Sequence, residues 1–167
     1  MSLELKSSIN DFLNSSLSKK FSGVSFNRKS YFLGKWIEHG DWYPDAKIRL
    51  SKKSLSRWGG SEEHDLLKVD GRVLHLKGNL LHYSYRDINH LINKSLYFSD
   101  LFVKRIVLVD DCRKKSLFEI ILRSFVRFFR AYFLKLGFLD GYQGLLIAVN
   151  SSFFVFIKYI KLNFNKR

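Results

Sequence analysis

A run of four polar residues, Glu62-Glu63-His64-Asp65, places three carboxylates and an imidazole side by side. A carboxylate can take a proton from an attacking hydroxyl group, and a neighbouring imidazole can orient that carboxylate or bind a phosphate. Transfer of a sugar with inversion at its anomeric carbon requires such a base. The alternative interpretation is a solvated acidic loop, which composition alone favours.

Aromatic and cationic side chains flank this run at Trp42, Arg49 and Trp58. Aromatic faces stack on sugar rings, and a guanidinium group forms paired hydrogen bonds with phosphate. Gly59-Gly60 predicts a loop that can approach a ligand closely, because glycine has no side chain to obstruct it. The alternative is ordinary core packing of the two tryptophans and a surface position for the arginine.

A third group of candidate site residues is His82-Tyr83-Ser84-Tyr85. A histidine at a strand end can complete a metal site or bind diphosphate, whereas a hydrogen-bonded core histidine is the alternative. A zinc site built from the histidines has no recognised ligand spacing. We therefore predict no metal site within this chain.

The positive charge is concentrated in the last part of the chain. Residues 101–167 carry 13 Lys and Arg against 4 Asp and Glu, and they hold 11 of the 16 Phe. Such a segment fits an anionic partner that also accepts apolar groups, which an anionic membrane surface does. A single-stranded nucleic acid is a rival partner, and burial of the helices in a hetero-oligomer is another alternative.

Arg123, Arg127 and Arg130 fall three or four residues apart within a helix predicted over residues 116–136. They form one narrow stripe that aliphatic and aromatic residues enclose. This arrangement suits a helix lying in the headgroup layer and argues against a nucleic-acid partner. The longest uncharged run, residues 141–157, contains several polar residues, so we expect an interfacial or packed helix rather than a spanning one.

The elements that position these residues follow from apolar spacing and turn signals. We expect a helix over 2–17, a strand over 21–33 and a second strand that begins at residue 47. Asp70-Gly71 predicts a hairpin between strands 65–69 and 72–76, with His82 on the side of the core leucines. A capping box at 84–87 precedes a second helix, and a last helix covers 142–162. The buried side of the helix after the capping box should be formed by Ile88, Leu91, Ile92, Ser95, Phe98 and Phe102.

Taken together, these motifs resemble the later part of family 2 glycosyltransferases of the GT-A type, in particular those of lipopolysaccharide core biosynthesis. The resemblance rests on four segments in order: Trp42-Tyr43-Pro44-Asp45, Arg49-Leu50, Arg57-Trp58-Gly59 followed by His64-Asp65, and His82-Tyr83-Ser84-Tyr85. The segment from Gly137 to Gly141 and the pair Lys158-Tyr159 are similar to the tail of that family.

The resemblance implies roles for individual residues. Asp65 would be the catalytic base with His64 beside it, and Glu63 is the reserve base because the family prefers Glu at the position of Asp65. The residues expected to bind substrate are Trp42, Arg49, Trp58, His82 and Tyr83.

The implied fold is α/β, with a partial GT-A-like domain over residues 1–110 and a basic, aromatic, membrane-associating helical tail over 111–167. The implied function is transfer of a sugar from a nucleotide-sugar donor to the lipopolysaccharide core or another lipid-linked saccharide. We expect peripheral attachment to the cytoplasmic face of the inner membrane. The rival function is a non-catalytic membrane-peripheral interaction module.

The sequence contains neither an Asp-x-Asp motif nor a Gly-rich phosphate loop. We therefore expect the donor-binding half, with its Mg²⁺ or Mn²⁺ cofactor, to precede Met1. The chain would then be a truncated gene product or one half of a split enzyme, and inactive alone.

Overall fold

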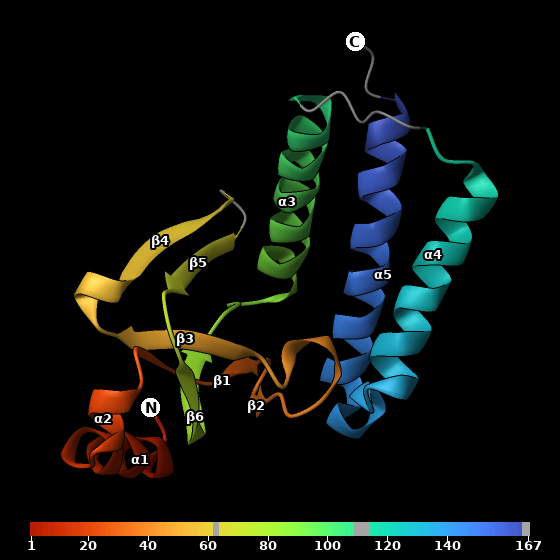
Figure 1. Ribbon diagram of the computed structural model, residues 1–167. Helices are drawn as coiled ribbons and strands as arrows, with labels where there is room; N and C mark the ends of the chain where they lie inside the picture. Colours follow the sequence, from red (N-terminus) through yellow and green to blue (C-terminus); the bar gives the residue numbers. More distant parts are fainter. Residues whose placement is uncertain (62–63, 109–113, 165–167) are drawn as a thin grey trace. The chain divides into compact units, whose positions relative to one another are not determined.

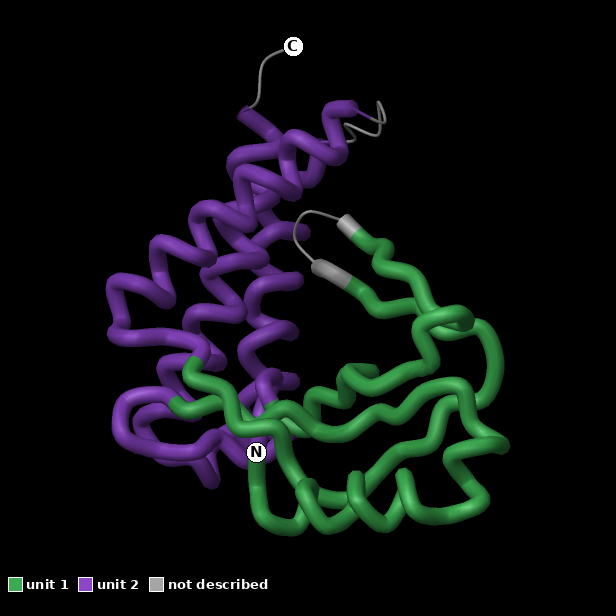
Figure 2. The backbone as a smooth tube through the Cα atoms, turned by 90° about the vertical axis from the view of Figure 1, so that its left-hand side faces the viewer, with its two compact units in different colours: residues 1–31, 43–83 green, residues 32–42, 84–167 purple. Residues whose placement is uncertain are grey.

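The computed structural model describes residues 1–61, 64–108 and 114–164. The chain forms two compact units, one of residues 1–31 and 43–83 and the other of residues 32–42 and 84–167 (Figures 1 and 2). As the sequence predicted, the fold is mixed α/β with long helices towards the C-terminus. The predicted functional boundary near residue 110 stays a prediction.

The first unit is built around β1 (Gly23–Phe32). This strand pairs antiparallel with β3 (Ala46–Ser51) and parallel with β6 (Val73–Tyr83). The sheet has the order β2-β1-β3, where β2 is Lys35–Trp36, and β6 also pairs with β1. The strands predicted near residues 21–33 and 47 are thus confirmed.

Helix α1 (Leu3–Asn14) covers the apolar face of this sheet, and the short α2 (Leu17–Lys20) follows it. Leu5 and Phe12 of α1 form a buried cluster with Val24 and Phe26 of β1, which share a face because strand side chains alternate. Each such side chain contributes roughly 1.5–3 kcal/mol when it is fully buried.

The N-terminus of α1 contacts β6 at Gly78 and Asn79. Ser2 accepts a hydrogen bond from the Leu5 amide as the helix cap, and its Oγ accepts another from the Asn79 amide at 3.0 Å. Gly78 has a φ of +97°, and a Cβ at this position would lie 2.5 Å from the Leu5 nitrogen. The β1–β6 register shifts here, between Ser25 and Asn27.

A second sheet consists of β4 (Ser56–Ser61) and β5 (His64–Val69), which pair antiparallel. The predicted hairpin across Asp70-Gly71 is therefore wrong, because β5 pairs with β4 and β6 pairs with β1. Gly59-Gly60 lies within β4 and not in a loop. A 3-10 turn, Lys53–Leu55, leads into β4.

The second unit consists of helices and the inserted segment 32–42, which contains β2. Figure 1 shows α5 (Gly141–Phe164) between α3 (Ile88–Leu108) and α4 (Leu117–Phe129), and α5 packs against both. A π-helical turn, Arg130–Leu134, extends α4, and a 3-10 turn, Gly137–Asp140, leads into α5. A further 3-10 turn, Gly40–Trp42, ends the inserted segment 32–42.

Helix α3 differs from its prediction at its cap and at its buried face. Asp87 caps it by accepting a hydrogen bond from the His90 amide at 2.7 Å, whereas the sequence placed the cap at Ser84. Leu91 and Ser95 of the predicted buried side are buried, whereas Ile88 and Ile92 are exposed. The buried face also carries Ser99, which was not predicted. The Ser95 hydroxyl donates a hydrogen bond to the side-chain oxygen of Asn150 on α5.

The close approach of α1 to Gly78 predicts a large cost for a side chain there. Gly78→Ala should lower the free energy of unfolding by roughly 2–4 kcal/mol, because it combines a left-handed backbone with a clash. Gly34→Ala is the control, since Gly34 has a φ of +83° with open space around it and should cost about 1 kcal/mol. Urea denaturation measures both, and equal losses would show that α1 does not constrain residue 78.

Candidate functional site

His64 and Asp65, the described part of the acidic cluster, begin β5, which pairs with β4. Gly60 pairs with Asp65 and Ser61 with His64. For His64 and Asp65 the structure describes the backbone, and Glu63 lies outside the described residues. The hairpin therefore holds the backbone of the predicted base in a regular strand, and the catalytic roles stay predictions.

Trp58 lies on the same hairpin and is 67% exposed, so the core-packing alternative is wrong for this residue. The guanidinium carbon of Arg49, on β3, lies 5.9 Å from the centre of the Trp58 ring. An exposed indole beside a guanidinium group offers an aromatic face for stacking and hydrogen-bond donors for a phosphate in one place. The structure thus brings two of the predicted substrate-binding residues together.

Trp42 belongs to the second unit and has a different environment. Its ring stacks on Tyr85 with a centroid distance of 4.8 Å and an interplanar angle of 15°. It also meets the buried Phe32 ring edge-on at 5.3 Å. This half-buried aromatic packing is the core alternative, so a substrate contact by Trp42 stays a prediction.

His82 and Tyr83 end β6, and both are exposed. The Tyr83 ring packs against Tyr31 of β1 at 5.2 Å. The buried cluster under α1 includes Leu80 but not His82, so His82 is not a core histidine. Both side chains are accessible to a ligand on the first unit.

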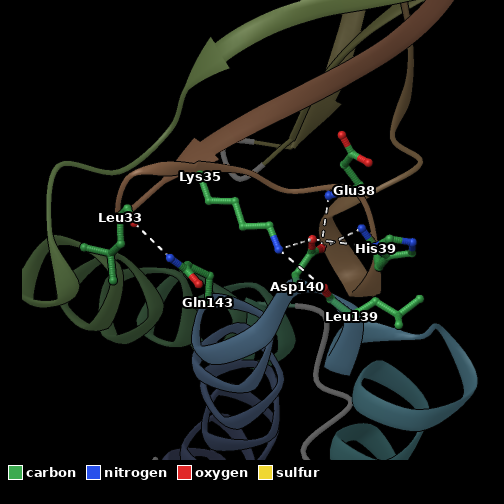
Figure 3. Close-up of polar contacts among 7 residues, drawn as sticks. All are labelled: Leu33, Lys35, Glu38, His39, Leu139, Asp140 and Gln143. Atoms are coloured by element: carbon green, nitrogen blue, oxygen red, sulfur yellow. Dashed lines mark hydrogen bonds and ion pairs between the residues drawn. The ribbon is translucent and has the colours of Figure 1, made fainter.

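Sequence reasoning missed the Asp140 carboxylate, which is 1% exposed (Figure 3). Its Oδ2 accepts hydrogen bonds from the backbone amides of Glu38 and His39 at 3.0 and 2.8 Å. Its Oδ1 pairs with the Lys35 ammonium at 3.2 Å. Beside it, Gln143 donates a hydrogen bond to the Leu33 carbonyl at 2.9 Å. The Gly137–Gly141 segment therefore fastens the inserted segment to α5.

Asp41 is a second buried carboxylate that the sequence did not reveal, with a side chain that is 4% exposed. Its two oxygens pair with Arg127 of α4 at 3.0 Å and with Lys135 at 3.1 Å. The partners of Asp41 lie 86 and 94 residues later in the sequence, so no local sequence pattern could have indicated these ion pairs.

The predicted arginine stripe exists and lines a cavity. Arg123, Arg127 and Arg130 all face a cavity of about 460 Å³ between α4 and α5. Lys158 of α5 lines the same cavity, which sequence reasoning did not include in the site. We call this cavity the basic groove; its remaining lining residues are Glu119, Leu122, Val126, Val155 and Tyr159.

Two charged residues of the basic groove have shifted pKa values. Hydrogen bonding from Arg123, with a smaller contribution from Lys115, holds the pKa of Glu119 below its usual range. Burial lowers the pKa of Lys158, and repulsion from Arg127, Arg105 and Arg123 lowers it further.

Helix α4 also has an exposed apolar face, which we call the α4 apolar face. Phe118 is 75% exposed and Phe125 is 63% exposed, although helices of globular proteins normally bury such residues. The other members of this face are Leu117, Ile121, Leu122, Val126 and Phe129. One helical segment, Gly137–Phe164, is long and apolar enough by composition to cross a membrane.

Among the described residues, no group of three His, Cys, Asp or Glu side chains is placed to hold a metal ion. The prediction of a Mg²⁺ or Mn²⁺ cofactor held elsewhere in the enzyme stays a prediction.

The chain is similar to two rickettsial proteins. It is 30% identical over 124 residues to an uncharacterized glycosyltransferase of Rickettsia typhi, a match that covers 69% of this chain and 41% of that protein. It is 30% identical over 92 residues to an uncharacterized glycosyltransferase of Rickettsia prowazekii, covering 55% and 30%. The chain thus spans less than half the length of these relatives, and it is related to glycosyltransferases over that part.

No family model matches the chain. No solved structure matches it either, so the GT-A type of fold stays a prediction from the sequence motifs.

The burial of Asp140 predicts a loss of stability on neutralisation. Asp140→Asn should lower the free energy of unfolding by roughly 2–4 kcal/mol, because the amide keeps one acceptor oxygen but leaves Lys35 without its charge partner. Asp100→Asn is the matched control; it breaks the exposed ion pair with Lys161 and should cost no more than about 1 kcal/mol. Chemical denaturation of both variants would contradict the assignment if their losses were the same.

Proposed function

We propose that this chain is the acceptor-side part of a family 2 glycosyltransferase of the GT-A type. The enzyme transfers a sugar from a nucleotide-sugar donor to the lipopolysaccharide core or another lipid-linked saccharide. The observation that carries the proposal is the exposed Trp58, with Arg49 beside it, on the hairpin that also carries His64 and Asp65. The similarity to two proteins named as glycosyltransferases supports the same class of reaction.

In the proposed reaction, an acceptor hydroxyl oxygen attacks the anomeric carbon of the donor sugar. The bond from that carbon to the diphosphate oxygen breaks, and the nucleoside diphosphate leaves with the bonding electrons. Asp65 takes the hydroxyl proton, with Glu63 as the alternative base, and His64 orients the carboxylate or contacts a phosphate. Trp58 stacks on a sugar ring while Arg49 binds phosphate.

The remaining predicted substrate contacts are Trp42, His82 and Tyr83. The last two are exposed at the end of β6, where an extended acceptor can reach them. The donor and its Mg²⁺ or Mn²⁺ ion would be bound by a part of the enzyme outside these 167 residues. The absence of Asp-x-Asp from the sequence and the greater length of the matched relatives support this division.

We further propose that the second unit attaches the enzyme peripherally to the cytoplasmic face of the inner membrane. The α4 apolar face supplies insertable side chains, and Arg123, Arg127 and Arg130 supply positive charge on the same helix. Membrane attachment through these features does not require a sugar-binding site. They therefore support equally the second candidate function, a non-catalytic membrane-peripheral interaction module.

The first test concerns the base. In an enzyme that combines this chain with a donor-binding part, Asp65→Asn should lower kcat by roughly 10²-fold or more, the scale of losing a general base. Glu63→Gln is the matched control and should retain most activity. The assignment moves to Glu63 if the two results are reversed, and the interaction-module function is favoured if no combination transfers sugar.

The second test concerns the membrane. Replacing Phe118 and Phe125 by Ser should reduce flotation with both neutral and anionic liposomes and remove the part of binding that resists high salt. Tyr97→Ser, which changes an exposed aromatic residue on α3, should leave flotation unchanged. Unchanged flotation of the double variant, or extraction by detergent alone, would contradict peripheral attachment through α4.

A further inference from the structure

We propose that the basic groove between α4 and α5 is a binding site for a phosphate or diphosphate group. Arg123, Arg127, Arg130 and Lys158 line it against the single acid Glu119, so the lining has an excess of three positive charges. The inference deepens the proposed membrane attachment and rests on it only for the source of the phosphate.

The cations of the groove are not fully satisfied by the protein. Arg123 donates from Nε to Glu119 at 2.9 Å, and Nη2 of Arg127 pairs with Asp41. The buried Nε of Arg127 has no acceptor among the described residues. No carboxylate of the described residues pairs with Arg130 or Lys158. The charges of Arg130 and Lys158 are therefore not neutralised by a carboxylate, and an anion in the groove would neutralise them.

Lys158 is the residue whose environment most favours an anion in the groove. Its ammonium lies over the rings of Phe102, Tyr159 and Phe154, at 4.6, 5.0 and 5.2 Å from their centres. These rings offer cation–π attraction, but burial and the neighbouring guanidinium groups still lower the pKa of Lys158. An apolar residue would fill this position without that cost, so the lysine serves stability poorly. An anion would turn the surrounding repulsion into attraction.

The chemistry of the lining selects phosphate among anions. The groove offers guanidinium forks from α4 and from the π-helical turn that extends it, and an ammonium from α5. Guanidinium groups match the tetrahedral oxygens of a phosphate, and a lysine adds a compact charge. Two sources share this chemistry, a lipid headgroup and a soluble phosphate compound. Leu122 and Val126 line the groove and belong to the α4 apolar face, which favours the lipid source.

Titration of the full chain with inorganic pyrophosphate tests the groove without any membrane. Calorimetry should show binding of one pyrophosphate per chain, and Lys158→Met and Arg130→Gln should each weaken it by roughly tenfold or more. Arg57→Gln, an exposed arginine of the first unit, should change the affinity by less than about twofold. Absence of binding, unchanged affinity in the groove variants or an equal loss in Arg57→Gln would overturn the proposal.

Thermal unfolding separates a binding role from a structural one. Without ligand, Lys158→Met should melt at a higher temperature than the wild type, because the cost of the buried charge is removed. With pyrophosphate, the wild type should gain more in Tm than the variant does. If Lys158→Met melts at a lower temperature than the wild type and its Tm still rises as much with pyrophosphate, Lys158 has a structural role and no binding role.

Liposomes identify the source of the phosphate. Phosphatidylcholine vesicles containing phosphatidic acid should release the chain when pyrophosphate is added, and Lys158→Met should bind them more weakly. If pyrophosphate binds but neither effect occurs, the groove binds a soluble phosphate compound and the lipid source is rejected. If the chain does not float with any of the liposomes but still binds pyrophosphate, the proposed membrane attachment is wrong and the proposed phosphate site in the groove stands.

Discussion

The second unit depends on one buried carboxylate, that of Asp140. Placing a charge in the protein interior costs several kcal/mol unless hydrogen bonds and an opposite charge compensate for it. Two backbone amides and the Lys35 ammonium do so here, and all three come from residues 35–39. The carboxylate is compensated only when this segment is in place, and the segment is held by this carboxylate together with the burial of Phe32 and Ile37 against Leu91 and Ile147. Asp41 repeats the arrangement towards α4 through Arg127 and Lys135.

The packing of α5 on α4 determines what these two helices present to solvent. It brings Arg123 and Arg127 of α4 and Lys158 of α5 to one cavity. The large side chains of α4 are left on the outside. The two buried carboxylates act at one end of this pair, where Asp140 precedes α5 and Asp41 pairs with Arg127 of α4.

The parts of the structure that the sequence revealed are those with local causes. The helices that begin near residues 2 and 116, the strand around Val24 and Phe26 and the arginine stripe all follow from spacing within a few residues. The sequence did not reveal which distant segments pair. Asp70-Gly71 marks a turn, but the strands on either side of it belong to different sheets. Within the candidate site, the sequence predicted a shared substrate-binding role for Arg49 and Trp58. It did not predict a role for Lys158, because Lys158 lies near the arginines only through the packing of α5 on α4.

The interleaving of the two units has a consequence for how the chain is made. Synthesis completes the first unit at residue 83, whereas residues 32–42 must wait for α4 and α5. His39 and Asp140 are 101 residues apart, and contacts of such sequence separation form slowly because the intervening chain must first be ordered. During translation the buried ring of Phe32 and the amides of residues 38 and 39 therefore have no partner from α5. A fragment that starts at residue 84 would have the complementary defect, because its Asp140 carboxylate would lack the two backbone amides and the Lys35 ammonium that compensate it.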